Sequence, residues 1–247
     1  MRATALKYLG VGLLAAILSA CFFARANTIP NQHYPTLNSL NLGIAYTSLA
    51  LLGLALAIGP LARLSARTFG RLVELRREVG VVGGLLALAH VVLSVRIHVN
   101  WRWPLFFFNL DRNRIVEVNY RVDGIANWLG LAAVLLLLPI LLSSNDLAER
   151  FLGAPGWKWL QSHTYTLFAL AAFHTSIFLQ AAAKGKTRPA DFWPTFWLTV
   201  GGTLLLQTLA FAVTIARRRA RTRRAIAARN RDTSTPTVTP STVNGDH

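Results

Sequence analysis

The chain has 247 residues, of which 53% are hydrophobic and only 15% are charged, and its formal net charge is +16. A soluble domain of this length carries more charge and shorter apolar runs, so this composition excludes a water-soluble globular protein. The apolar residues collect in blocks of about twenty, the length that crosses a bilayer as a helix. The only cysteine, Cys21, excludes an intramolecular disulfide and any metal site built from several cysteines.

Six hydrophobic segments follow one another along the chain, and each predicts a membrane-spanning helix. Their approximate limits are 8–24, 40–62, 79–96, 125–143, 163–183 and 192–216. All seven tryptophans fall near predicted helix ends or in the adjoining loops, where aromatic residues gather at the membrane interface. We therefore predict an all-α fold, an integral membrane bundle of six transmembrane helices within residues 1–216.

The first span contains a competing signal. Its "LSAC" (18–21), behind a basic start and an apolar stretch, has the form of a bacterial lipoprotein cleavage site, which would remove the span and lipidate Cys21. Phe22 and Phe23 continue the apolar run where an exported lipoprotein turns polar, so we favour an uncut helix. Either outcome leaves spans three to six in place.

The distribution of Lys and Arg predicts the orientation of the bundle. With both termini in the cytoplasm, the inner segments hold 17 of these residues and the outer segments hold 9. Cytoplasmic loops of membrane proteins carry the excess of positive charge, so we expect cytoplasmic N- and C-termini. The outer loop 96–124, which contains "NWRWPLFFFNLDRNR", is then the expected docking surface for an outer partner.

Two segments follow the last span. The basic cytoplasmic extension 217–231, "RRRARTRRAIAARNR", predicts a helical continuation that lies against anionic membrane lipid. A nucleic-acid arm is the weaker interpretation behind six membrane spans, and we expect no nucleic-acid partner. Residues 232–247 are rich in Thr, Ser and Pro with little to bury, which predicts a disordered tail.

Only two of the six histidines lie well inside predicted spans, namely His90 and His174. The other four are in a loop, at the last position or at helix ends: His33, His247, His98 and His163. An ionisable side chain at membrane depth is costly and usually has a function or a partner. His90 and His174 are each 11 residues past the start of their spans, or about 16 Å of helix. Because spans three and five cross in the same direction, the two rings are expected at matching depth.

Two imidazoles at one depth can bind the two faces of a haem iron. Small residues near them, Gly83, Ala87 and Ala171, would leave room for a porphyrin. The same residue types also line ordinary close contacts between membrane helices. Spacing alone therefore leaves haem, a hydrogen-bonded histidine pair or proton relay, and a simple metal site as alternatives.

Two stretches around these histidines resemble the ferric-reductase-like transmembrane family. They are "RREVGVVGGLLALAH" (76–90), which is similar to the start of the family's third helix, and "LLLLPILLSSNDLAERFLGAPGWKWLQ" (135–161), which is similar to the exit of its fourth. The resemblance covers residues 63–180. It is closest to the family's bacterial branch, the haem-binding membrane subunits that serve periplasmic methionine sulfoxide reductases.

The resemblance implies a b-type cytochrome in the bacterial inner membrane, with His90 and His174 as the axial ligands of a haem b. Its implied donor is a cytoplasmic flavin reductase or the quinone pool, with FMN or quinone as a further cofactor, and its implied acceptor is a periplasmic reductase subunit. The chain contains no G-x-G-x-x-G turn followed by a strand, so we expect no nucleotide-binding domain of its own. A histidine-relay transporter and a non-redox membrane anchor remain the alternative functions.

The chain departs from the family pattern where a second pair of ligands would stand. Gln161 occupies the position of the family's first histidine on helix five, and Arg77 lies 13 residues before His90. Neither is an ordinary haem ligand, so one haem is expected. His163 has three interpretations: an asymmetric second ligand, a contact to a haem propionate, or a helix cap. Arg77 could pair with haem carboxylates or simply satisfy the positive-inside bias.

Overall fold

The computed structural model describes residues 2–27, 36–111, 114–184 and 192–234. Helices dominate the described chain, and the only sheet within it is one short hairpin. The elements in chain order are α1 (Arg2–Asn27), α2 (Thr36–Leu64), α3 (Ala66–Phe69), η1 (Gly70–Leu75), α4 (Arg76–Val99), η2 (Trp103–Phe106), β1 (Phe108–Asp111), β2 (Arg114–Val118), α5 (Val122–Leu142), α6 (Asp146–Ser162), α7 (Thr164–Lys184) and α8 (Trp193–Ser234).

The predicted all-α membrane bundle is confirmed. Among the described residues, five helices are long and apolar enough to cross a membrane, namely α1, α2, α4, α5 and α8. The fifth predicted span corresponds to α7, which has 21 residues and includes polar side chains such as His174 and Gln180. α7 packs alongside the candidate span α5, which also has 21 residues.

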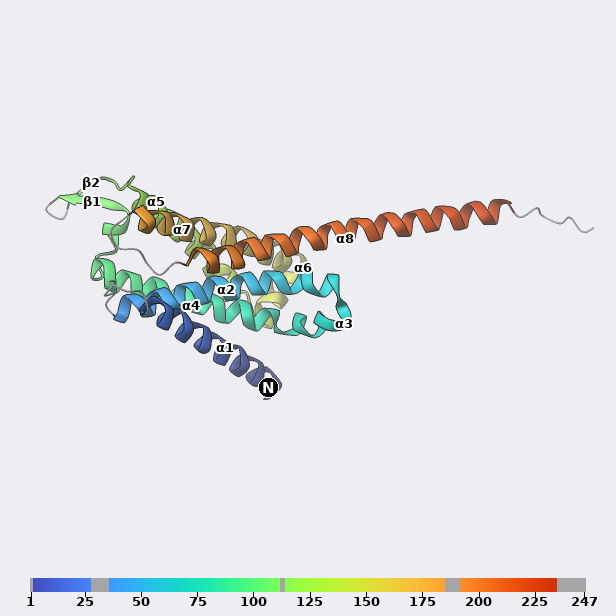
Figure 1. Cartoon of the computed structure of the whole chain (residues 1–247), viewed down its shortest axis with the longest axis horizontal. Helices are drawn as coiled ribbons and strands as arrows, with labels where there is room; N and C mark the ends of the chain where they lie inside the picture. The colour runs from blue at the N-terminus through green and yellow to red at the C-terminus, as the bar shows by residue number, and fades with distance from the viewer. Residues whose placement is uncertain (1, 28–35, 112–113, 185–191, 235–247) are drawn as a thin grey trace, which may run out of the picture.

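Helices α4 and α7 run in the same direction, as their odd-numbered places among the spans predict (Figure 1). Both begin near α3 and α6 and both end near the hairpin. We call the end that carries β1 and β2 the hairpin end, and the opposite end the terminal end, because α1 starts and α8 extends there (Figure 1). Matching depth for two residues on α4 and α7 is therefore possible.

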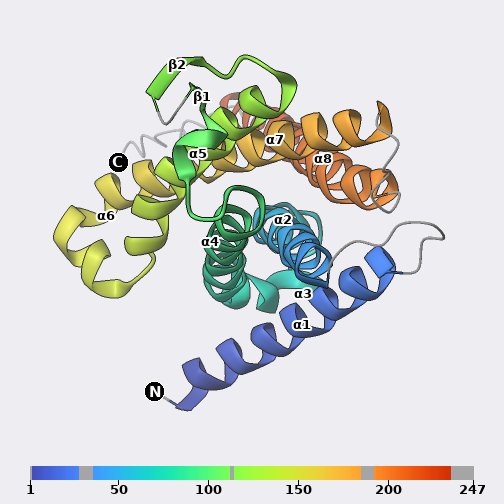
Figure 2. The ribbon, with the colours of Figure 1, turned by 90° about the vertical axis from the view of Figure 1, so that its left-hand side faces the viewer.

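Helix α2 is the centre of the bundle and contacts α1, α4, α7 and α8. Figure 2 shows α2 and α4 in the middle, with α1 on one side and α5, α7 and α8 on the other. About 67% of the apolar window of α2 is buried, against 17% to 22% for the other four candidate spans. Polar side chains on α2 accordingly point into protein, and the buried ones are Ser39, Asn41, Thr47 and Ser48.

The contact between α2 and α4 depends on a glycine. A Cβ at Gly83 would lie 3.1 Å from the Cβ of Leu51 and 3.3 Å from the backbone nitrogen of Leu52. The absence of a side chain lets the two backbones approach closely, as small residues do in membrane helix pairs. The hydroxyl of Ser48 donates to the Gly83 carbonyl at 2.8 Å and fixes the pair across this contact.

The segment 144–162, which connects the fourth and fifth predicted spans, is largely the helix α6. Asn145 caps its N-terminus, because its side-chain oxygen accepts from the backbone N–H of Ala148 at 2.8 Å. The helix is kinked at Gly153, whose φ of 69° lies in the left-handed region, with Pro155 two residues further on. The chain remains helical on both sides of the kink.

The 96–124 segment is also more ordered than a simple loop. It contains η2 and the antiparallel hairpin β1–β2, in which Phe108 pairs with Val118. The rings of Phe107 and Phe108 pack against Trp128 of α5, with centroids 4.8 and 5.8 Å away. These aromatic contacts fasten the hairpin over the end of α5.

Helix α8 continues well past the bundle, as the basic extension predicts (Figure 1). It runs from Trp193 to Ser234 without interruption, and residues 216–227 are all exposed. Arg217 donates to the carbonyl of Arg63 at 2.8 Å, where the helix leaves the bundle. Most of the tail predicted to be disordered, residues 235–247, lies outside the described residues.

Candidate functional site

His90 and His174 lie on α4 and α7, two helices that run in the same direction. Helices α4 and α7 each contact both α2 and α5 and make few direct contacts with one another. The two histidines are half-buried, and each has its Nδ1 hydrogen-bonded to an oxygen on a neighbouring helix. The structure therefore places the two predicted residues on two helices that share the neighbours α2 and α5.

The ring of His90 is held by an amide from α2. Its Nδ1 lies 2.9 Å from Oδ1 of Asn41, and Nδ2 of Asn41 donates to the Ser94 hydroxyl at 2.9 Å. Because the amide nitrogen is directed at Ser94, the amide oxygen faces His90, and Nδ1 must carry the proton that is donated. Nε2 of His90 is then left with its lone pair.

The ring of His174 is held by the main chain of α5. Its Nδ1 donates to the carbonyl oxygen of Ala126 at 2.7 Å, and a carbonyl can only accept. A Cβ at Gly130 would lie 2.9 Å from Nδ1 and 3.0 Å from Cε1, so the ring packs directly on the glycine backbone. Phe178 contacts the His174 ring edge-on, with centroids 5.0 Å apart. Nε2 of His174 also keeps its lone pair.

Both histidines therefore adopt the tautomer that transition metals require of an Nε2 ligand. A second hydrogen bond from Nδ1 to an oxygen is the usual support of a metal-binding histidine, since it fixes the ring and raises the basicity of Nε2. No group of three or more His, Cys, Asp or Glu side chains suited to a metal ion occurs among the described residues. Two ligands suit a haem iron, whose four other positions are filled by the porphyrin.

His163 lies elsewhere. It is the residue between α6 and α7, where its Nδ1 donates to the carbonyl of Trp159 one turn earlier at 2.9 Å. Its ring also contacts the Trp159 ring, with centroids 4.6 Å apart. The structure thus places His163 at a helix end, about 16 Å of helix from His174. His98, near the end of α4, is exposed.

Arg77 and Gln161 both contact the turn that ends α5. Nε of Arg77 donates to the Ser144 carbonyl at 2.9 Å, and its guanidinium pairs with Asp146 at 2.6 Å. Nε2 of Gln161 donates to the Ile140 carbonyl at 3.2 Å and to the Ser143 hydroxyl at 3.1 Å. Both side chains are therefore engaged in closing the terminal end of the bundle.

The small residues near the histidines mainly serve helix packing. Gly83 faces α2, so the room beside it is filled by α2 and is not open toward His174. Ala171 packs on the core cluster around α2, while Ala87 packs on a cluster formed by α5 and α7. The glycine that makes room at a histidine is Gly130, which the sequence did not single out.

Two supporting residues were missed from the sequence, Asn41 and Gly130. An amide within an apolar span is itself a signal, because a buried polar group needs a partner. The helix that supplies the partner is decided by how the span with the amide is rotated about its own axis. These spans are apolar on nearly every face, so the sequence pattern does not indicate that rotation. Gly130 carries no signal that separates it from other glycines in a membrane helix.

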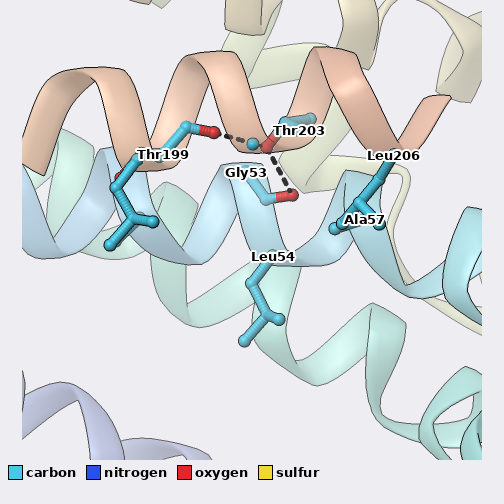
Figure 3. Close-up of a pocket in the computed structure, with 9 residues that line it drawn as sticks. Gly53, Leu54, Ala57, Thr199, Thr203 and Leu206 are labelled. Carbon is cyan, nitrogen blue, oxygen red and sulfur yellow. Dashed lines mark hydrogen bonds between the residues drawn. The ribbon is translucent and has the colours of Figure 1, made fainter. Parts of the chain in front are cut away.

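The structure also contains a shallow groove of about 300 Å³ between α2 and α8 (Figure 3). The hydroxyl of Thr203 donates to the Thr199 carbonyl at 2.7 Å and lies 3.4 Å from the carbonyl of Gly53. Every lining residue belongs to α2 or α8. The groove is therefore separate from the histidine site, to which α4 and α7 contribute.

The chain is similar in sequence to several known proteins. A magnetosome protein, MamZ, from Magnetospirillum gryphiswaldense is 30% identical over 142 residues, which are 54% of this chain and 20% of that protein. The heme-binding subunit MsrQ of protein-methionine-sulfoxide reductase from Herminiimonas arsenicoxydans is 30% identical over 127 residues, 51% of this chain and 52% of that protein. The MsrQ of Azospira oryzae is 25% identical over 172 residues, 65% of this chain and 67% of that protein.

The chain thus spans a fifth of the first relative and about half of the second. The family described as ferric reductase like transmembrane component matches residues 42–172, which is just over half of the chain. The matched region includes His90 and ends just before His174, so it covers most of α2, all of α4 and α5, and the first part of α7. The chain belongs to the ferric reductase-like transmembrane family.

Proposed function

We propose that the chain is a b-type cytochrome membrane subunit in which Nε2 of His90 and Nε2 of His174 bind the two faces of one haem b. The observation that carries the proposal is the shared tautomer. Each Nδ1 donates to an oxygen from a neighbouring helix, which leaves each Nε2 as a free donor atom. When bound, haem supplies reversible one-electron chemistry at the iron.

The chain's own residues do three things for such a group. Asn41 and the Ala126 carbonyl orient the two rings, and Gly130 admits the ring of His174 to its place on α5. The packing of Ala87 with Leu137 and Leu167 keeps the region toward the terminal end apolar. An apolar, enclosed setting limits side reactions and influences the reduction potential of the iron.

One haem fits the described residues better than two. A second site nearer the terminal end would need ligands at about the level of Arg77 and Gln161. Both side chains are already bonded to the end of α5, and neither is an ordinary haem ligand. His163 is bonded within its own helix turn and serves as a helix cap in this proposal.

The proposed direction of electron flow follows the orientation of the bundle. With 17 of the Lys and Arg residues on the side of the termini and 9 on the other, the terminal end faces the cytoplasm of a bacterial inner membrane. A cytoplasmic flavin reductase, or a quinol in the membrane, supplies electrons, and a periplasmic reductase accepts them at the hairpin end. The names of the MsrQ relatives support a methionine sulfoxide reductase as that acceptor.

The test is an absorption spectrum of the full-length protein in detergent, oxidised and then reduced with dithionite. We expect low-spin haem bands in the wild type and their loss in His90→Ala and in His174→Ala. His98→Ala and His163→Ala are matched controls, because they remove histidines that lie outside the pair, and they should keep the bands. A colourless wild-type protein would overturn the proposal and favour a histidine relay or a membrane anchor.

A further inference from the structure

Asn41 is a buried amide on α2 whose two polar atoms are both engaged with α4. Its side chain is 5% exposed, its Oδ1 accepts from Nδ1 of His90, and its Nδ2 donates to Oγ of Ser94. The two partners are one turn apart on the same helix. A polar group at membrane depth is costly unless it is fully bonded, so this amide occupies a site that is built for it.

The two histidines differ in how replaceable their supports are. His174 donates to the main-chain carbonyl of Ala126, which almost any residue at that position would supply. His90 donates to a side chain, so its partner depends on which residue stands at position 41. Position 41 is therefore the place where the electronic character of one ring can be adjusted by sequence.

We infer that Asn41 is a positioning residue for His90 and that it sets the reduction potential of the haem through that ring, an inference that rests on the proposed function. A hydrogen bond from Nδ1–H to an oxygen makes Nε2 a stronger electron donor. A stronger donor stabilises ferric over ferrous iron and lowers the reduction potential. A neutral amide oxygen gives an intermediate effect, between that of a carboxylate and that of no acceptor.

Ser94 keeps the amide in the orientation that His90 needs. Its hydroxyl accepts from Nδ2 of Asn41, which leaves Oδ1 toward the imidazole. Without the Ser94 hydroxyl, no acceptor holds Nδ2 of Asn41 away from His90, so the amide can rotate. Its N–H groups would then face the Nδ1–H of His90, and no hydrogen bond could form between the two donors. Ser94→Ala should therefore act in the same direction as loss of the amide, but more weakly.

Asn41 also joins α2 to α4, so a purely architectural role must be separated from an effect on His90. Ser48 offers the matched control. Its hydroxyl joins the same two helices by donating to the Gly83 carbonyl at 2.8 Å, it is 4% exposed, and it is hydrogen-bonded to no histidine. Ser48→Ala removes a buried bond between α2 and α4 and leaves the support of His90 intact.

The experiment is a potentiometric titration of the haem in full-length protein, with the retained haem measured in parallel. Asn41→Asp should lower the reduction potential and Asn41→Leu should raise it, each by about a tenfold change in the ferric-to-ferrous equilibrium, or about 59 mV for one electron. Ser94→Ala should raise it by less. Ser48→Ala should leave it at the wild-type value.

Shifts of the same sign in Asn41→Asp and Asn41→Leu, or shifts no larger than that of Ser48→Ala, would overturn the inference. The proposed function would survive that result provided that the wild type keeps a haem that is lost with His90 or His174. If Asn41→Leu does not fold, the other two variants decide the test: Asn41→Asp should lower the reduction potential and Ser94→Ala should raise it. A wild type without haem would instead defeat the proposed function, and the inference with it.

Discussion

Gly130 of α5 lies directly against the imidazole of His174 on α7, so closely that a Cβ at Gly130 would stand 2.9 Å from Nδ1. The ring cannot be displaced freely, because Nδ1 is also bonded to the Ala126 carbonyl at 2.7 Å. Gly130, which has no side chain, and the Ala126 carbonyl both belong to α5, so this helix alone fixes the position of the ring. The orientation of His174 is set by the surface of α5 on which it rests.

Gly130→Ala should therefore disturb the histidine site. The added methyl group must push the ring away from α5 or spread α5 from α7, which typically costs about 1–3 kcal/mol. We expect a severalfold loss of bound haem, measured as the ratio of the haem band to protein absorbance. Gly202→Ala is the control, because a Cβ at Gly202 meets nothing within 4 Å. Equal haem retention in the two variants would refute the described packing of His174.

Gly83→Ala should separate stability from haem binding. Its Cβ would meet Leu51 and the backbone of Leu52, neither of which can move without shifting α2, so we expect about 1–3 kcal/mol of destabilisation. The haem spectrum of the protein that remains folded should be unchanged, because Gly83 faces α2. Thermal unfolding in detergent measures the first effect, with Gly12→Ala as a control that has open space at its Cβ. A changed spectrum with unchanged stability would place Gly83 at the haem instead.

Gln161→His tests whether a second haem site exists at the terminal end. We expect the haem content to stay at one per chain, because the Gln161 side chain points to the end of α5 and Arg77 supplies no opposing ligand. Loss of the amide bonds to Ile140 and Ser143 should cost about 1 kcal/mol of stability. Haem and iron per chain are the measurements. A rise toward two haems per chain would contradict this expectation and show that a second haem site at the terminal end lacks only the histidine at position 161.

Arg77→Ala distinguishes a structural arginine from one that binds a haem carboxylate. The ion pair with Asp146 is solvent-exposed, with side chains 42% and 77% accessible, so its loss should cost less than about 1 kcal/mol. We expect a small drop in thermal stability and an unchanged reduction potential. Asp146→Asn removes the same pair and should behave in the same way. A shift in potential with Arg77→Ala alone would reassign the arginine to the cofactor.

The basic part of α8 should respond to lipid charge. Arginines surround this part of the helix on all sides and residues 216–227 are exposed, so anionic headgroups, at about 1 kcal/mol per basic residue, are its expected partner. In nanodiscs, trypsin should cut between Arg217 and Arg224 more slowly with anionic than with neutral lipid. High salt should remove the difference. Equal cutting rates at low salt would contradict this contact.

The sequence predicted the helical framework well, for physical reasons. Apolar blocks near twenty residues have few alternatives to a spanning helix, so the span at 79–96 lies within α4 and the one at 125–143 matches α5 to within a few residues. The expected equal depth of His90 and His174 rests on a residue count, because rise per residue is constant in a helix, and on the parallel direction of α4 and α7. The span limits and the residue count are quantities that are local to one segment.

Other features could not be predicted because they depend on contacts between segments. Asn41 and His90, which are hydrogen-bonded, are 49 positions apart in the sequence. The packing of the His174 ring on Gly130 depends on how α5 is rotated about its axis. Gly83 was placed beside the porphyrin by its spacing from His90, yet its rotation turns it toward α2. The helix α6 was not predicted because its sequence is not an apolar run of spanning length, and it forms as a kinked helix between α5 and α7.

The central claim is tested most directly by counting haem in the purified full-length protein and recording the electron paramagnetic resonance spectrum of its oxidised form. The account predicts one haem per chain with the low-spin signal of two imidazole ligands, and no such signal in either His90→Ala or His174→Ala. A high-spin signal in the wild type, or a low-spin signal that survives the loss of either histidine, would contradict it.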